Sequence, residues 1–268
     1  MHNIAGSPVE GEDFFGRESI VARLQEILAN DDILLLGPRR IGKTSVARAV
    51  MKQVRAAGWR AIEINVASCV DERGFLDKLE AALKPELSSP TARAADAVGD
   101  ALGALGRRIK SVKIPLPGAG SFGVELGEGG AEDWTQVAGD VLQLIAQMEE
   151  RWLIYVDELP ILLFNLIRND SETGVQRVRR FLDWFRNDVR ALPDARKLRW
   201  LISGSVGLDT LVQEHGMADT INSLSHQGLE PFSTEVAVAM LVELAGQYRI
   251  PLSDGDAGSI VAAVQWPQ

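Results

Sequence analysis

The stretch ILLLGPRRIGKTSVARAV, residues 33–50, decides the fold of this 268-residue chain. Its first four residues, 33–36, are all apolar and predict a buried strand. A loop with two glycines, one proline and three cations follows, and then a run with apolar residues at helical spacing, Val46, Ala47, Val50 and Val54. A strand, a glycine-containing loop and a helix in this order are typical of a parallel α/β sheet.

The loop matches the phosphate-binding pattern G-x-x-x-x-G-K-[ST] in full, in the strand-to-helix context that supports the motif. Backbone N–H groups of such a loop surround a β-phosphate, and the following helix N-terminus favours the same anion. We expect Lys43 to reach the β and γ oxygens and the Thr44 hydroxyl to ligate Mg²⁺, with Arg39 and Arg40 adding positive charge at the rim. The predicted nucleotide-binding residues are Gly37, Pro38, Arg39, Arg40, Ile41, Gly42, Lys43, Thr44 and Ser45.

A second part of the site is predicted at WLIYVDE, residues 152–158, where an apolar strand ends in two carboxylates. Asp157 is expected to hold Mg²⁺ through water, and Glu158 to orient or deprotonate the attacking water. An apolar strand ending in Asp-Glu is common and can also be surface charge. The phosphate loop more than a hundred residues earlier favours the functional interpretation.

A further apolar strand is predicted at RWLISGS, residues 199–205. Ser203 and Ser205 at its end could each donate a hydrogen bond towards a γ-phosphate, and we count them as catalytic candidates. It is equally open that Ser203 and Ser205 are only small polar residues of a turn.

The rest of the chain predicts further elements of an α/β fold. Helices are expected over 17–29, from the loop to Gly58, over 71–83, over 133–150 and over 174–192, and a strand over 60–67. A β-hairpin is expected at about 108–128 as an insertion. A short strand then leads into a helix with Ser233 as N-cap and Glu235 in its first turn.

The composition restricts the function classes. A net charge of −9 and a pI near 5.0 argue against bulk electrostatic binding to nucleic acid or anionic membranes. No apolar run approaches the roughly 18 residues of a membrane span, and the N-terminus lacks a signal-peptide pattern, so we expect a cytoplasmic protein without membrane contact. One cysteine, Cys69, and three scattered histidines predict neither a disulfide framework nor a zinc site.

Other motifs carry weaker alternatives. Residues 118–123 match G-x-G-x-x-G but lack a following helix, and SGSVG, residues 203–207, falls one glycine short of a nucleophile elbow. No guanine-reading Asn-Lys-x-Asp stretch is present, which makes a GTPase the weakest hypothesis. An arginine-rich helix could bind nucleic acid or supply an arginine to a neighbouring subunit, although interleaved aspartates favour a solvated face; its arginines are Arg177, Arg179, Arg180, Arg186 and Arg190.

Five segments together resemble the archaeal-type ATPases of the STAND class, which are related to AAA+ and Orc/Cdc6 proteins. They are FFGRES (14–19), GPRRIGKTS (37–45), WLIYVDELP (152–160), LISGSVG (201–207) and LEPFSTEVA (229–237). The resemblance implies that Phe15, Gly16 and Arg17 lie against the nucleotide base and that Pro231 belongs to the segment entering a helical lid. The family often has a Gly-x-Pro that approaches the nucleotide, and here the corresponding place reads Gln265-Trp266-Pro267.

The expected architecture is a three-layer α/β/α P-loop NTPase core with a parallel sheet of the ASCE/AAA type over residues 1–232. Residues 233–268 are expected to begin a helical lid that is cut short. The expected function is a Mg²⁺-dependent ATPase whose ATP/ADP state switches the lid, acting with itself as a homo-oligomer or with a regulatory protein. The alternative is an ATP-liganded nucleic-acid-binding module of the Orc/Cdc6 type, with the arginine-rich helix on the backbone.

Overall fold

The computed structural model describes residues 8–87, 133–204 and 207–264, so that the hairpin expected at about 108–128, Ser205 and the segment 265–268 lie outside it. Five strands form one sheet in which every pair is parallel, and this confirms the expected fold class. The short strand expected before the helix that Ser233 caps is present and ends at Gly228, a few residues before that helix. The sheet order is β2-β3-β4-β1-β5, with β1 at Ile33–Leu36, β2 at Arg60–Asn65, β3 at Trp152–Asp157, β4 at Leu198–Gly204 and β5 at Ser225–Gly228.

The helices follow the expected positions with two additions. Those confirmed are α1 (Glu18–Leu28), α2 (Lys43–Ala56), α3 (Glu72–Leu87), α5 (Trp134–Ala146) and α10 (Thr234–Gln247). The helix expected over 174–192 is α7 (Gly174–Asp183), a π-helical segment (Trp184–Asp188) and α8 (Val189–Ala191) in succession. Two helices, α6 (Leu159–Asn169) and α9 (Leu208–Glu214), lie outside the expected elements, and α11 (Asp254–Val264) ends the described chain.

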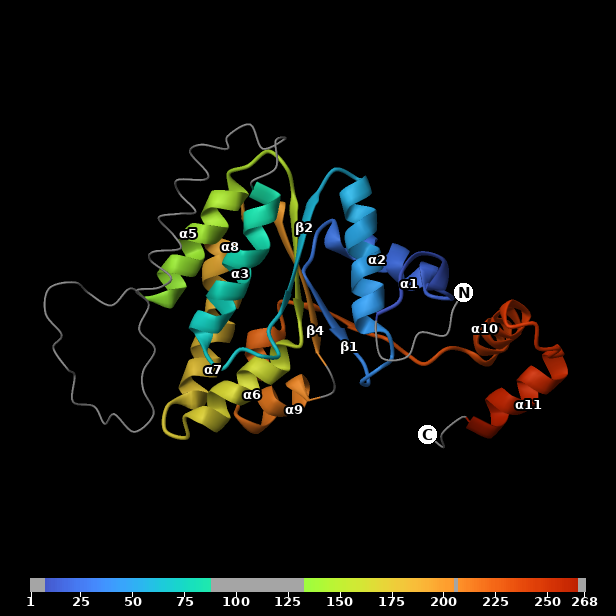
Figure 1. Cartoon of the computed structure of the whole chain (residues 1–268). Helices are drawn as coiled ribbons and strands as arrows, with labels where there is room; N and C mark the ends of the chain where they lie inside the picture. The colour runs from blue at the N-terminus through green and yellow to red at the C-terminus, as the bar shows by residue number, and fades with distance from the viewer. Residues whose placement is uncertain (1–7, 88–132, 205–206, 265–268) are drawn as a thin grey trace, which may run out of the picture.

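Two separate apolar clusters show that the sheet is covered on both faces. Side chains alternate along each strand, so Ile33 and Leu35 pack towards α1 and α2, whereas Leu34 packs into the larger cluster on the opposite face. Figure 1 shows α1 and α2 on one side of the strands and α3, α5, α6, α7 and α8 on the other. The result is the expected three-layer α/β/α arrangement.

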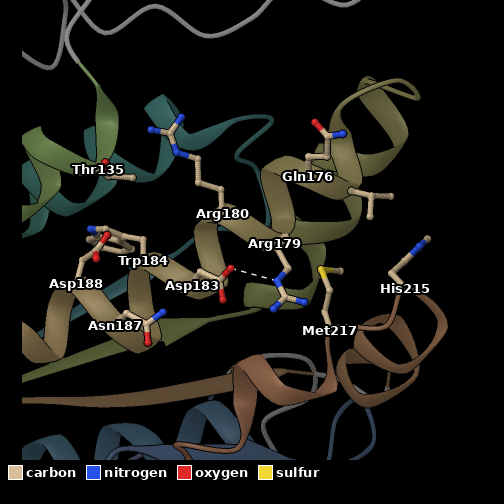
Figure 2. A pocket seen from close by; sticks show the side chains of 11 residues that line it. Thr135, Gln176, Arg179, Arg180, Asp183, Trp184, Asn187, Asp188, His215 and Met217 are labelled. Atoms are coloured by element: carbon tan, nitrogen blue, oxygen red, sulfur yellow. Dashed lines mark hydrogen bonds and ion pairs between the residues drawn. The ribbon is translucent and has the colours of Figure 1, made fainter.

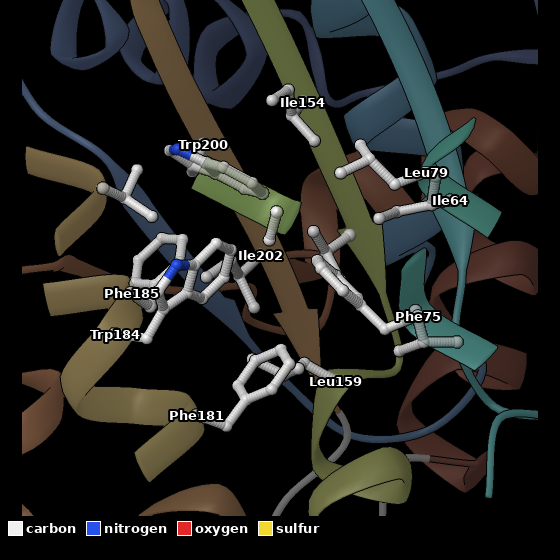
Figure 3. Close-up of a cluster of buried hydrophobic side chains, with 14 of the residues drawn as sticks. Ile64, Phe75, Leu79, Ile154, Leu159, Phe181, Trp184, Phe185, Trp200 and Ile202 are labelled. Atoms are coloured by element: carbon white, nitrogen blue, oxygen red, sulfur yellow. The ribbon is translucent and has the colours of Figure 1, made fainter. Parts of the chain in front are cut away.

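The larger cluster is built around aromatic rings (Figure 3). Phe75 and Phe181 meet edge to face with ring centroids 5.2 Å apart, and Phe185 meets Trp200 in the same way at 5.0 Å. Trp184 and Trp200 are each 2% exposed, as expected for core residues. The π-helical segment contributes both Trp184 and Phe185 to this core, so it anchors the α7–α8 layer to the sheet.

The strand order determines where the functional groups meet. Because the strands are parallel, their carboxyl ends share one edge of the sheet, the edge at which α/β proteins place their ligands. β4 lies between β1, which leads into the phosphate loop, and β3, which ends in Asp157. The loop and the carboxylate are therefore two strands apart and face the same edge.

Helices α10 and α11 pack against each other and lie apart from the sheet layers, on the side of α1 and α2 (Figure 1). Ser233 caps α10 by accepting a hydrogen bond from the Val236 N–H at 3.4 Å, as expected. Only Ala245, Ala257 and Val261 are buried among the described residues of this helical pair. Within the described chain, no helix combines the length and apolar character that a bilayer span requires.

Candidate functional site

The loop from Gly37 to Gly42 joins the end of β1 to Lys43, the first residue of α2. Gly42 has φ +100°, a left-handed conformation that a side chain disfavours, although a Cβ there would meet nothing within 4 Å. Gly37 is needed for a different reason, since its Cβ would lie 3.0 Å from the carbonyl oxygen of Leu229. Arg40 also has a positive φ, 65°, and its exposed side chain lies at the rim of the loop, as does that of Arg39.

The N-terminus of α2 opens towards this loop. The Val46 N–H begins the helical bonding by donating to the Gly42 carbonyl at 2.9 Å, and within the described residues no side chain caps the helix. The earlier N–H groups of the first turn therefore remain available to an anion, and the helix dipole adds partial positive charge there. The loop and helix fit a phosphate group.

Lys43 extends across the loop rather than into solvent. Its ammonium donates to the carbonyls of Gly37 and Pro38, each at 2.9 Å, and the residue is 6% exposed. An ammonium has three donors, so within the described chain these two bonds leave one for a ligand. Burial lowers the pKa of Lys43, the nearby charges of Glu158 and Asp157 oppose this shift, and Arg39 adds to it.

Asp157 is the centre of the second part of the site. Its Oδ2 accepts hydrogen bonds from the Thr44 hydroxyl at 3.3 Å and from the Asn65 side-chain amide at 3.2 Å, and its Oδ1 accepts one from the Ser203 hydroxyl at 2.5 Å. A hydroxyl and a carboxylate are the hard oxygen ligands that suit Mg²⁺. Thr44 and Asp157 therefore fit the expected magnesium ion by their chemistry and their closeness.

Glu158 follows in a strained conformation. It has φ 60° and ψ 39° immediately before α6, and a non-glycine residue in this region costs of order 1 kcal/mol. The strained position is maintained where β3 turns into α6, with Pro160 in the first helical turn. Glu158 is half-buried and acts on the Lys43 ammonium electrostatically, so it lies at the same edge as the loop.

Comparisons with known proteins give one short sequence match and a likeness in fold to solved structures. No protein-family model matches the chain. Among curated proteins, the Replication factor C small subunit of Natronomonas pharaonis is 38% identical over 69 residues, which make up 24% of this chain and 20% of that protein. This match covers too little of either protein to establish a common activity.

Two solved structures extend the likeness to nearly the whole chain. The Walker-type ATPase of Pyrococcus abyssi has a TM-score of 0.58 at 16% identity, over 97% of this chain and 66% of that one. The ORC2 protein of Aeropyrum pernix, solved as ADPNP and ADP complexes, has a TM-score of 0.56 at 11% identity, over 95% and 64%. The chain therefore has the fold of these two structures. It spans about two thirds of the length of each structure.

Ser203 lies near the end of β4, beside Asp157. It is fully buried, and its hydroxyl is directed to Asp157 Oδ1 and lies 3.1 Å from the Tyr155 hydroxyl. Among the described residues its partners are therefore Asp157 and Tyr155, and its contact with a γ-phosphate stays a prediction. Tyr155 and Asn65 were not among the expected site residues, although Asn65 is the last residue of β2 and pairs in register with Asp157.

The N-terminal segment contacts α2. The Val9 N–H donates to the Ser45 hydroxyl at 3.0 Å, and a cavity of about 380 Å³ next to Ser45 is lined by Phe14 and Ala49. Phe14 thus lines this cavity, whereas Phe15 is half-buried just beyond it.

The two residues after Phe15 contact the segment that leads into α10. The Arg17 guanidinium lies 4.1 Å from the centroid of the Phe232 ring, and a Cβ on Gly16 would lie 2.5 Å from Val236 Cγ1. Pro231, one residue before Phe232, is exposed. Segment 14–19 therefore bridges the phosphate-loop helix and the start of α10.

The charge of the arginine-rich helix is neutralised by carboxylates of neighbouring residues. Figure 2 shows the cavity of about 570 Å³ beside it, where Arg179 meets Asp183 at 3.1 Å. The pair between Arg177 and Glu72 is buried, with 10% and 3% of the side chains exposed. Each arginine has a carboxylate partner: Arg177 with Glu72, Arg179 with Asp183 and Asp219, Arg180 with Asp133, Arg186 with Asp219, and Arg190 with Asp32.

Proposed function

We propose that the chain is a Mg²⁺-dependent ATP-binding and ATP-hydrolysing switch. One observation carries the proposal: the lysine of a complete phosphate loop lies across that loop while the adjacent Thr44 hydroxyl contacts Asp157, over a hundred residues away. The fold supports it, since the chain is similar over 97% of its length to the structure of a Walker-type ATPase.

Each side chain has a chemical role in this proposal. The loop and the α2 N-terminus bind the β-phosphate, and the remaining donor of Lys43 reaches the β and γ oxygens. Thr44 and Asp157 would hold Mg²⁺, which supplies charge neutralisation at the phosphate oxygens when bound. Glu158 orients a water and accepts its proton as the water oxygen bonds to the γ-phosphorus and the bond to the ADP oxygen breaks.

Binding of ATP is the direct test. We expect ATP with Mg²⁺ at about 100 times its Kd to raise the free energy of unfolding by about 2.7 kcal/mol, measured by thermal or urea unfolding. GTP at the same concentration should raise it less, because the sequence lacks a guanine-reading motif. A folded chain whose stability does not respond to ATP would rule out the proposed function.

The switch part of the proposal rests on the contacts of segment 14–19. Gly16 and Arg17 touch Val236 and Phe232 next to α10, while Val9 is bonded to Ser45 of α2. A nucleotide that displaced the N-terminal segment would therefore also act on the start of α10. We propose that residues 233–268 belong to a helical lid whose position follows the nucleotide state. A second copy of the chain or a regulatory protein would bind in response to that change.

Gly16→Ala tests this link. Gly16 has φ +67° and no room for a Cβ against Val236, so the substitution should separate segment 14–19 from α10. We expect amide hydrogen exchange in the first turns of α10 to rise several-fold and to lose its response to ATP. Gly246→Ala is the matched control, because a Cβ there meets nothing within 4 Å. Equal exchange in Gly16→Ala and wild type would contradict the link.

The same fold suits an ATP-liganded nucleic-acid-binding module of the Orc/Cdc6 type. That alternative would place the helix of residues 177–190 on the DNA backbone, where its guanidinium groups would have to exchange their carboxylate partners for phosphates. Affinity for duplex DNA that is measurable at low salt and falls steeply with added salt would support it. No binding at low salt would reject it.

A further inference from the structure

We propose that Tyr155 is a positioning residue that acts through Ser203 to fix the Asp157 carboxylate, and that this hydroxyl chain sets the Mg²⁺ affinity of the site. The proposal rests on the proposed function, since it assigns the two hydroxyls to the metal-binding half of the proposed ATP site. It adds a residue that the phosphate-loop and carboxylate motifs do not contain.

The topology places the three side chains together. Tyr155 and Asp157 are two residues apart on β3, so they face the same side of the sheet. β4 pairs in parallel with β3, with Tyr155 opposite Leu201 and Val156 opposite Ile202, and this register brings Ser203 beside Asp157. The hydrogen-bonded chain of Tyr155, Ser203 and Asp157 is therefore fixed by the order and register of β3 and β4.

The hydrogen bonds have a defined direction. An ionised carboxylate only accepts, so the Ser203 hydroxyl donates to Asp157 Oδ1 at 2.5 Å. The Ser203 oxygen is then the acceptor for the Tyr155 hydroxyl, 3.1 Å away. The phenolic O–H of Tyr155 supplies the proton of this hydrogen bond.

The surroundings of Tyr155 favour this role over simple packing. Its ring lies in the cluster between the sheet, α1 and α2, where the neighbours in register and sequence, Leu153 and Leu201, are aliphatic. Tyr155 and Ser203 are both 0% exposed. A buried hydroxyl is costly unless it is bonded, whereas phenylalanine would fill the same space without that requirement.

The hydroxyl chain of Tyr155 and Ser203 acts on Asp157 Oδ1, the carboxylate oxygen that Thr44 and Asn65 do not contact. Asp157 Oδ2 accepts from Thr44 and Asn65, while Oδ1 accepts from Ser203, so donors hold both oxygens and fix the carboxylate plane. In a low-dielectric site, successive hydrogen bonds strengthen one another. Without the Tyr155 hydroxyl, Ser203 can rotate away from Oδ1, and the carboxylate loses the orientation that a metal ion would require.

The test compares Tyr155→Phe and Ser203→Ala with wild type, and Tyr248→Phe, at a residue 54% exposed, is the control. A fluorescent ATP analogue is titrated at a series of Mg²⁺ concentrations and in EDTA. Since outer-shell partners typically change metal affinity by about 10–100-fold, we expect the Mg²⁺ concentration for half-maximal binding to rise about tenfold in Ser203→Ala and about threefold in Tyr155→Phe. Affinity in EDTA should stay within about twofold of wild type.

The outcomes separate this proposal from the proposed function. If wild type binds the analogue with a Mg²⁺ response and both variants respond identically to it, the positioning role is wrong and the ATP site stands. If the variants lose affinity equally with and without Mg²⁺, the hydroxyl chain supports the fold only, and the proposal is again overturned. A folded wild-type chain that binds no analogue overturns both.

Discussion

Glu158→Gln should bind Mg-ATP with nearly unchanged affinity and release phosphate about 10²–10⁴-fold more slowly than wild type, the usual contribution of a general base. Glutamine keeps the size and one oxygen of the side chain, but it cannot accept the proton of the attacking water. Glu158 is half-buried at the edge that holds the loop, and its charge acts on Lys43. Steady-state phosphate release and calorimetric ATP binding measure the two effects separately.

The control for this variant is Glu214→Gln, which makes the same chemical change at an exposed residue of α9. Its turnover should equal that of wild type. Equal turnover in Glu158→Gln would show that the base lies elsewhere or that a contaminating ATPase is measured. A loss of ATP binding together with turnover would place Glu158 in binding rather than in catalysis.

Lys43→Ala should weaken ATP binding by about 100-fold, since a hydrogen bond from a charged group contributes about 1.5–3 kcal/mol and the lysine is placed to reach two phosphates. The substitution also removes the bonds to the Gly37 and Pro38 carbonyls, which tie the two ends of the loop together. Isothermal titration with ATP and Mg²⁺ gives the affinity.

The matched control is Lys78→Ala, which deletes an exposed lysine on α3 and should leave ATP affinity within twofold of wild type. Thermal unfolding of both variants distinguishes a lost phosphate contact from a lost fold. Tight ATP binding by a folded Lys43→Ala chain would refute the role given to the phosphate loop.

The sequence is most informative where one element has several independent signals. β1 has the bounds expected from its four apolar residues, because a glycine loop ends it at once. The π-helical segment inside 174–192 could not be expected, since its apolar positions follow ordinary helical spacing. Ser233 was identified because a capping side chain and an acidic first turn occur together.

The helix α6 shows why one periodic signal can be missed. Leu159, Leu162, Leu163 and Leu166 are buried at the spacing of a helix face. The outer face is also apolar in part, and it includes Phe164, which is 57% exposed. A run that is apolar on both faces has no clear period, so its helix is apparent only when the fold shows which side meets the sheet.

Some residues of the candidate site could likewise be predicted from the sequence, and others could not. Lys43, Thr44 and Asp157 belong to motifs, and the contact between Thr44 and Asp157 was implied by their shared metal. Asn65 and Tyr155 reach Asp157 and Ser203 only because β2 and β4 flank β3. Strand order is a property of the whole fold, so local sequence could not identify them.

Because β4 lies between β1 and β3, the backbone of the sheet determines the separation between the phosphate loop and Asp157. Two inter-strand spacings, about 9–10 Å, separate the strand that leads into the loop from the strand that ends in Asp157. This separation does not depend on side chains, because the backbone hydrogen bonds between neighbouring strands define it. Repacking either core cluster should leave it unchanged. The vulnerable point is the tip of β4, where a Cβ on Gly204 would lie 2.5 Å from the Pro160 ring and push α6, and Glu158 with it, out of alignment.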